Sequence, residues 1–277
     1  MNCKWISTVL LLLPLSSAFA LDLDSEIARA TQTPLARNPE TKYYSFPFVN
    51  DLNFGYGPYK RTQNVLYLKP IISFQLTSSY DLILRVIAPL FNHQPSTVAS
   101  QNYINGWGDL NPTTFVSPFR YRTTLWGLGP TLYIPTASNK ALGTGKWSLG
   151  PEFALFSMPD RWVLGILTSN VWSIAGDPSR SAVNQFSLQY FISYNFPKGW
   201  YITSQPTITA NWKASANQVW TVPFGIGGGK AFHFNEDGMT VSVEGFYNVV
   251  RPAQQGPDWT IQAKLEFNIA DRKVIPL

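Results

Sequence analysis

Residues 185–212 read QFSLQYFISYNFPKGWYITSQPTITANW, and this stretch has the pattern of a long β-hairpin. Apolar and polar residues alternate on both sides of Pro197-Lys198-Gly199, which has the composition of a tight turn. Successive side chains of a strand point to opposite faces, so each arm has one apolar side and one polar side. The apolar sides carry Phe186, Leu188, Tyr190, Ile192, Tyr194 and Phe196 in the first arm and Trp200, Ile202, Ile208, Ala210 and Trp212 in the second.

Aromatic residues stand at both ends of this apolar strip. Phe196 and Trp200 flank the turn, while Phe186 and Trp212 lie at the far end. The two interfaces of a bilayer favour such aromatic ends. Each arm also suits a tilted membrane strand of roughly nine to eleven residues better than a soluble strand of about five or six. The hairpin therefore indicates a membrane β-barrel, with a sheet of a secreted sandwich as the alternative.

The composition of the whole chain fits a barrel. Of 277 residues, 13% are charged and 15% are aromatic, whereas soluble proteins have roughly 25% charged residues. The mean hydropathy is only -0.06, and no apolar run approaches the ~18 residues of a spanning helix. Alternating strands produce this combination, because half of their residues face lipid and the other half face water.

The N-terminus has the features of a secretory signal peptide over residues 1–20. A positive Lys4 precedes an apolar core, and Ala18-Phe19-Ala20 is a small-x-small cleavage site. We predict a periplasmic leader over residues 21–42 and an outer-membrane barrel over residues 43–277. The single cysteine, Cys3, lies in the signal peptide, so the mature chain has no disulfide, catalytic thiol or cysteine metal site.

The rest of the chain reads as strand after strand, with Pro and Gly at the breaks. Short and long connections alternate, which is typical of outer-membrane barrels with short periplasmic turns. An even strand count requires one further strand before Asn64, and Tyr43–Tyr59 supplies it. We predict an all-β, transmembrane, antiparallel up-and-down barrel of twelve strands, with ten as the alternative. The other eleven strands are expected at Asn64–Leu76, Tyr80–Leu90, Trp107–Ser117, Phe119–Ile134, Lys146–Ser157, Trp162–Ser173, Gln185–Phe196, Trp200–Trp212, Gln218–Phe232, Met239–Val250 and Asp258–Ile269.

The charged residues of these strands fall on the polar face, except in Phe119–Ile134, where the pattern does not assign a register and Arg120 and Arg122 are expected near the periplasmic rim. A charged side chain that faces hydrocarbon costs roughly 2–4 kcal/mol at the midplane, so this placement is expected of a membrane barrel. Both signs occur, which indicates weak ion selectivity or paired charges that partly plug the lumen. Inward aromatic residues would contact apolar solutes or simply fill a small barrel. The residues predicted to line the lumen are Lys69, Arg85, Glu152, Phe191, Tyr201, Glu244, Lys264 and Glu266.

Several motifs resemble one outer-membrane family. Residues 53–64 read NFGYGPYKRTQN, and GWGDL, GLGP with IPT, LGTGK, and VPFG with GK follow in order at 106–110, 127–136, 142–146 and 222–230. This set is similar to the family named for the MetA pathway of phenol degradation, and the likeness covers about Tyr43 to Ile269. The resemblance implies an outer-membrane barrel that passes small, aromatic compounds, and it implies no reaction. One departure is the tail DRKVIPL at 271–277, where many barrels end in an aromatic residue.

Other candidate sites are weak. Residues 225–230 read GIGGGK, but Phe224 and Ala231 break the spacing of a phosphate-binding loop. His93 and His233 are expected far apart, which argues against a shared metal site. A lipid-active enzyme built on His93, with Ser96, Ser100 and Asp109 nearby in sequence, lacks a nucleophile motif.

We therefore predict a non-enzymatic outer-membrane channel for small, aromatic or hydrophobic solutes. The alternatives are a barrel with a structural or surface-recognition role, carried by residues 91–106 and 175–184, and less favourably the enzyme around His93. The expected partners are outer-membrane lipid, the barrel-assembly machinery, periplasmic chaperones and a small solute. Export makes a nucleic-acid partner improbable despite the net charge of +5, and no cofactor is implied.

Overall fold

The structure is a computed structural model that describes residues 42–77, 79–96, 102–118, 124–234, 237–252 and 256–271. The predicted signal peptide, almost all of the predicted leader, and Arg120 and Arg122 lie outside these ranges and stay predictions. No helix in the described ranges is long and apolar enough to cross a membrane.

Fifteen β-strands form a single sheet. Two single-turn 3-10 helices lie at Pro197–Gly199 and Ala216–Gln218. The strands are β1 (Lys42–Tyr56), β2 (Arg61–Leu68), β3 (Ile71–Gln75), β4 (Tyr80–Pro95), β5 (Tyr103–Gly106), β6 (Asn111–Pro118), β7 (Thr124–Tyr133), β8 (Lys146–Ser157), β9 (Trp162–Gly176), β10 (Asn184–Asn195), β11 (Trp200–Ser204), β12 (Thr207–Asn211), β13 (Trp220–Phe234), β14 (Asp237–Val250) and β15 (Trp259–Asp271).

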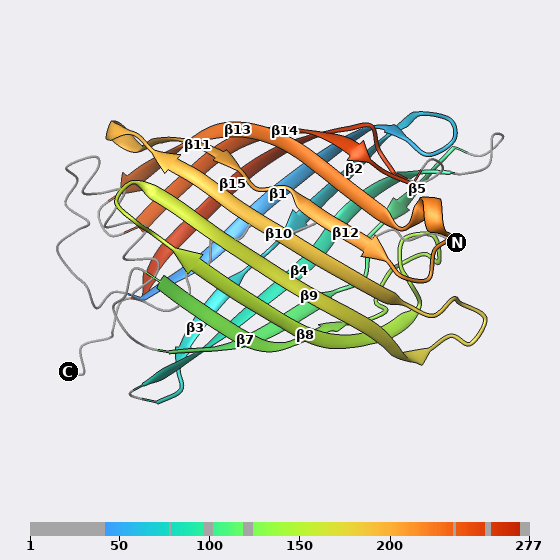
Figure 1. Cartoon of the computed structure of the whole chain (residues 1–277), viewed down its shortest axis with the longest axis horizontal. Helices are drawn as coiled ribbons and strands as arrows, with labels where there is room; N and C mark the ends of the chain where they lie inside the picture. Colours follow the sequence, from blue (N-terminus) through green and yellow to red (C-terminus); the bar gives the residue numbers. More distant parts are fainter. Residues whose placement is uncertain are drawn as a thin grey trace.

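The sheet closes into a barrel because its first strand pairs with its last (Figure 1). β1 and β15 are antiparallel, from Lys42 opposite Asp271 to Phe54 opposite Trp259. Two of the crossings are each divided by a proline, which has no N–H for the ladder: β2 and β3 are separated by Lys69-Pro70, and β11 and β12 by Gln205-Pro206. β5 pairs only with the outer end of β4. Twelve strands therefore cross the barrel, as predicted, and the alternative of ten is wrong.

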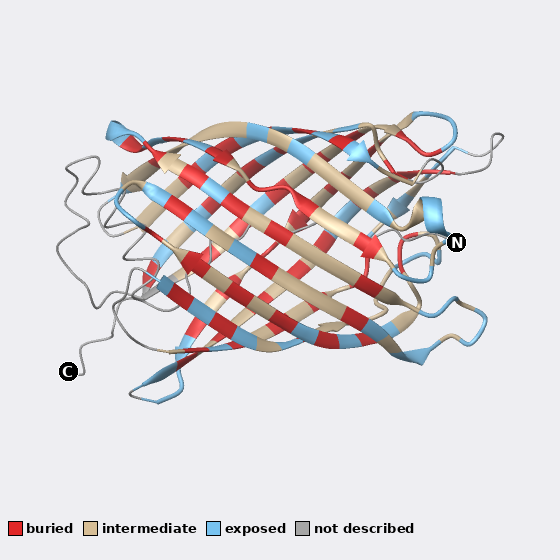
Figure 2. Cartoon of the chain, in the orientation of Figure 1, coloured by how far each residue is buried: buried red, intermediate tan, exposed pale blue. Residues whose placement is uncertain are grey.

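Buried and more exposed residues alternate along the strands, as Figure 2 shows. In β15, Gln262, Lys264 and Glu266 are buried, while Trp259 and Ile261 on the other face are exposed. Most polar members of the strands thus face the barrel interior and most apolar members face outward. This arrangement is the inverse of a soluble protein and is the one expected of a barrel in lipid. Lys230, on the outward face, departs from the predicted inward placement of the charges, and the buried Phe156 and Phe191 depart in the opposite sense.

The hairpin of residues 185–212 keeps one register over its whole length, from Gln185 opposite Asn211 to Asn195 opposite Tyr201. Lys198 and Gly199 make the turn with φ of 66° and 79°, in the left-handed region that favours glycine. Ala210 faces outward with the aromatic residues but is fully buried. The reason is a cluster of Phe186, Trp212 and Trp220, whose ring centroids lie 5.4–6.4 Å apart around it.

Two predicted segments differ from the structure. The segment expected as the first long loop, residues 91–106, contains the end of β4 and β5, which pair from Asn92 opposite Gly106 to Pro95 opposite Tyr103. The polar composition of this segment suggested a loop, whereas β4 continues through it and pairs with β5. The strand expected to begin at Trp107 begins at Asn111 instead, because residues 107–110 are held by loop contacts described below.

The direction of side chains in β10 generates a test of the lipid-facing surface. Leu188 lies on the outward face, and its neighbour Ser187 lies on the inward face. We expect Leu188→Arg to lower the free energy of unfolding by roughly 2–4 kcal/mol, because it places a charge in hydrocarbon. Ser187→Arg on the same strand should have a much smaller effect. Urea unfolding of the barrel from lipid vesicles measures both, and equal losses would contradict the assigned faces.

Candidate functional site

The interior face of the barrel holds all eight residues predicted to line the lumen. None is more than 7% exposed, and the charged members are 1–4% exposed. They come from strands all round the wall, so the closed sheet brings together residues that are far apart in sequence. That they line an open path for a solute stays a prediction. The eight residues are Lys69, Arg85, Glu152, Phe191, Tyr201, Glu244, Lys264 and Glu266.

Arg85 and Glu152 form a buried ion pair inside the barrel. The Arg85 Nη2 atom lies 2.7 Å and 2.8 Å from the two carboxylate oxygens of Glu152. Thr113 lies between them, since its hydroxyl donates to Glu152 at 2.8 Å and accepts from Arg85 at 2.9 Å. β4, β6 and β8 each supply one of these residues. A buried charge is tolerated only with such a partner, so the pair braces this side of the interior.

A second ion pair lies at the seam where the barrel closes. Lys264 Nζ is 2.9 Å from Glu266 Oε2, and the Ser45 hydroxyl donates to Glu266 Oε1 at 2.7 Å. Further along the same two strands, where Asp51 lies opposite Gln262, the Gln262 side-chain amide donates to Asp51 at 2.8 Å. Polar side chains of β1 and β15 therefore join the first and last strands inside the barrel, in addition to the backbone ladder.

Lys69 lies between these two groups. It is attracted by Asp51 and repelled by Arg85 and Lys264, and its ammonium lies 4.6 Å from the centre of the Tyr67 ring. Asp51 was not among the predicted lumen residues, because Pro47 made β1 hard to read. The alternation that begins at Ser45 places Asp51 inward and would have identified it. We call the charged residues that are buried at the interior face of the wall the inner charge belt: Asp51, Lys69, Asp81, Arg85, Glu152, Glu244, Lys264 and Glu266.

Glu244 occupies a gap in the wall. β11 pairs with β13 up to Thr203 opposite Gly227, and β12 resumes pairing only at Thr209 opposite Thr221. Between these points, in stretches that the structure describes, no ladder pair joins the two strands. The Glu244 carboxylate accepts from the Gln205 backbone N–H at 3.2 Å. It thereby satisfies a donor that the break at Pro206 would otherwise leave unpaired.

Apolar side chains cover another part of the interior. The rings of Phe156 and Phe191 lie 5.1 Å apart between β8 and β10. Leu125, Val163 and Leu167 are buried in the same cluster. The interior thus offers a charged wall and an apolar wall, a combination suited to solutes with both characters.

The longer connections meet at the end of the barrel where β5 lies, which we call the long-loop end (Figure 1). Asp109 is 5% exposed and accepts from the backbone N–H groups of Ala137 and Thr144 at 3.1 Å and 2.7 Å. The Thr144 hydroxyl adds a bond of 3.0 Å, and the Trp107 indole donates to the Thr136 carbonyl at 2.9 Å. Three of the motifs behind the family resemblance, at 106–110, 134–136 and 142–146, therefore form one clasp between two loops.

Two further charged residues tie loops together at this end. The Arg180 side chain donates to the carbonyl groups of Lys140, Gly143 and Thr144. Asp258 pairs with Lys60 at 2.8 Å and also with Arg251, which links the loops on either side of the β1–β15 seam. The hydrogen bond from Lys60 holds the pKa of the Asp258 carboxyl below its usual range.

The two histidines lie at opposite ends of the barrel, as expected. His93 is near the long-loop end, where its ring stacks on Tyr103 with centroids 3.9 Å apart and its Nδ1 lies 2.6 Å from Asn105. Asp109 is held by the loop clasp, and Ser100 lies outside the described residues. His233 lies opposite Gly238, at the other end of the barrel. No group of three His, Cys, Asp or Glu side chains in the described ranges is arranged to hold a metal ion.

Comparison with solved structures places this architecture among channels. One similar structure is the COG4313 outer membrane channel from Pseudomonas putida F1, with 16% sequence identity and a TM-score of 0.62, over 83% of this chain and 94% of that one. The chain has the fold of an outer-membrane channel. A second is the NanC porin, with 14% identity and a TM-score of 0.50, over 81% of this chain and 98% of that one.

These likenesses establish the fold only. No family model matches the chain, and no curated protein is similar to it. The family named for the MetA pathway therefore stays a resemblance of motifs. Of these two similar structures, one is a channel and the other a porin.

The buried pair of Arg85 and Glu152 can be tested by a double-mutant cycle. Removing one partner leaves the other charge buried and alone, so we expect Arg85→Met or Glu152→Met to cost about 3–5 kcal/mol of unfolding free energy. The double variant Arg85→Met/Glu152→Met should recover most of that loss. Urea unfolding in vesicles gives the coupling energy, and simple additivity would show that the two residues act independently.

The loop clasp can be tested at Asp109. Asp109→Ala removes the acceptor for the Ala137 and Thr144 amides, and a hydrogen bond to a charged group is worth about 1.5–3 kcal/mol. We expect hydrogen exchange at both amides to accelerate by about tenfold or more. Asp177→Ala, in an exposed turn, is the matched control and should leave both rates unchanged. Unchanged exchange in the Asp109 variant would contradict the clasp.

Proposed function

We propose that this protein is an outer-membrane channel for small solutes. The observation that carries the proposal is a closed barrel with an apolar outer face and an interior that combines charged and apolar walls. The fold shared with the COG4313 channel supports it. The predicted outer-membrane location belongs to this proposal, because the likeness to channels is one of fold.

The inner charge belt supports a solute class as well. A strongly ion-selective pore needs a ring of one sign, whereas this belt holds Lys and Arg beside Asp and Glu. Arg85 and Lys264 are already engaged by Glu152 and Glu266. Weak ion selectivity is the expected result. The apolar wall of Phe156 and Phe191 favours small aromatic or hydrophobic compounds, in agreement with the motif resemblance to the MetA-pathway family.

A second candidate function is a barrel without an open pore that acts through its outer surface. Two observations favour it: the ion pairs of the belt occupy part of the interior, and the contacts of Asp109 and Arg180 tie loops together at the long-loop end. The same loops would then form a recognition surface. Conductance separates the two candidates.

The test is conductance of the refolded barrel in a planar bilayer, first in salt and then with phenols and small aromatic acids. We expect discrete current steps, a reversal potential near zero in a salt gradient, and block by an aromatic solute. Phe191→Ala removes an inward ring and should raise the step size. Ile192→Ala, its outward neighbour, is the matched control and should not change it. A folded barrel without current in every variant would favour the surface role.

A further inference from the structure

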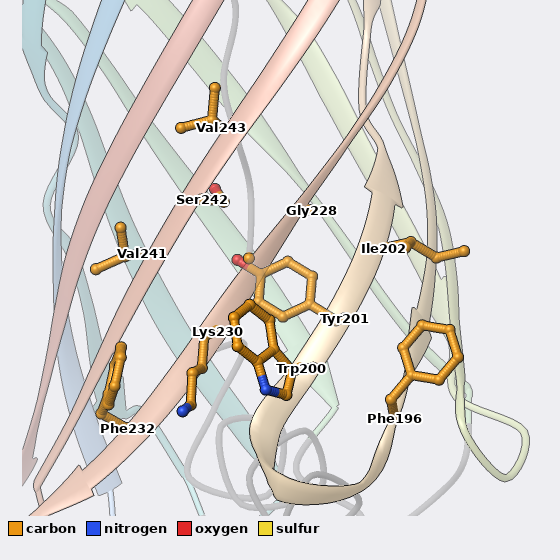
Figure 3. Close-up of a pocket in the computed structure, with 11 residues that line it drawn as sticks. Phe196, Trp200, Tyr201, Ile202, Gly228, Lys230, Phe232, Val241, Ser242 and Val243 are labelled. Atoms are coloured by element: carbon orange, nitrogen blue, oxygen red, sulfur yellow. The ribbon is translucent and has the colours of Figure 1, made fainter.

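A groove lies on the outward face of the wall, between β11, β13 and β14 (Figure 3). Its volume is about 600 Å³. Gly228 leaves the floor without a side chain, while Ile202 stands on one flank and Val241 and Val243 stand on the other. Ile202 and Val243 are more than 40% exposed, so the groove opens to the surroundings of the barrel.

Lys230 lies at one end of this groove. Its ladder partners are Trp200 of β11 and Val241 of β14, and both of these residues are exposed on the outward face. Its side chain is therefore on the apolar face, where a charge near the membrane midplane would be costly. Lys230 lies opposite Trp200, next to the short turn at Pro197–Gly199, and a lysine at such a depth can direct its ammonium group to the interface.

Two aromatic rings hold the ammonium group in place. Lys230 Nζ lies 5.0 Å from the centre of the Trp200 ring and 5.1 Å from that of Phe232. Figure 3 shows the Lys230 and Trp200 side chains next to each other below Gly228. Cation–π contacts orient the cation but do not neutralise it. Among the described residues, no acidic side chain lines this groove, so the charge is available to an anion from outside the protein.

We propose that the groove binds one anionic phospholipid of the leaflet at the short-turn end. The phosphate group lies at Lys230 between Trp200 and Phe232, and one acyl chain runs over Gly228 between Ile202 and Val243. A free phosphate ion would use the cation but none of the apolar walls, and a neutral lipid would leave the cation unpaired. A single molecule with a phosphate head and an acyl chain satisfies both parts of the groove.

This inference rests on the part of the proposed function that places the barrel in a membrane, and it is independent of whether the lumen conducts. The two can fail separately. Lipid binding that depends on Lys230 in a barrel without conductance would leave the lipid site standing and reject the channel. The converse result would reject the lipid site alone.

The experiment is native mass spectrometry of the detergent-purified barrel titrated with dioleoyl phosphatidylglycerol. One lysine near a membrane surface contributes about 1 kcal/mol, so Lys230→Met should weaken binding of the first lipid about fivefold. Lys230→Arg should restore binding, since it keeps the charge. Val243→Phe should also weaken binding, because the ring fills the groove.

Matched controls separate the groove from general effects. Lys198→Met removes a cation from the neighbouring turn, and Val249→Phe enlarges an outward residue of β14 outside the groove; both should bind like the wild type. Dioleoylglycerol, which lacks the phosphate, should bind more weakly and be insensitive to Lys230→Met. The proposal is overturned if Lys230→Met binds like Lys198→Met, or if glycerol 3-phosphate displaces the lipid at an equal concentration. Heat-modifiable gel migration confirms that each variant is folded.

Discussion

The two-residue period of the pleated strand is the constraint on which the rest of this structure depends. It sends every charge of the inner belt to one side of the sheet and every outward aromatic to the other. A slip of one residue in a single strand reverses both faces. In β15 such a slip would move Lys264 and Glu266 into hydrocarbon and cost roughly 4–8 kcal/mol, a large part of the whole stability of a typical domain at about 5–15 kcal/mol. The register is therefore fixed by solvation as much as by backbone pairing.

The interior shows how such a wall carries buried charge, because most of its carboxylates have hydrogen-bond partners. Glu152 and Glu266 each accept from a hydroxyl as well as a cation, at Thr113 and Ser45 respectively. Glu244 instead accepts from the backbone at the proline break. The belt residues thus face the interior and also connect strands of the wall through hydrogen bonds. The same side chains that would meet a solute also hold neighbouring strands together, which limits how freely the lining can change.

The sequence predicted the parts of the fold that rest on local periodicity. Long alternating segments such as residues 185–212 were assigned correctly, because the alternation of apolar and polar residues within each segment indicates both its length and its outward face. Asp51 was missed because Pro47 interrupted the pattern of its strand. The Asp109 clasp and the direction of Lys230 could not be predicted, since they depend on loop contacts and on register between strands. The glycine run at 227–229 does not have the spacing of a phosphate-binding loop, and its structural consequence is a hollow in the outer face.

The pairing of β1 with β15 has a consequence for how the protein is made. Ser45 and Glu266, which meet inside the barrel, are 221 residues apart, and closing so long a chain costs on the order of 5 kcal/mol in entropy. Until β15 has been synthesised and docked, the growing sheet has two open edges, which are templates for pairing with other chains. A chain that lacks its last strand would therefore form an open, aggregation-prone sheet and not a slightly smaller barrel. The final thirteen residues of the sheet decide whether the other strands become a barrel or an aggregate.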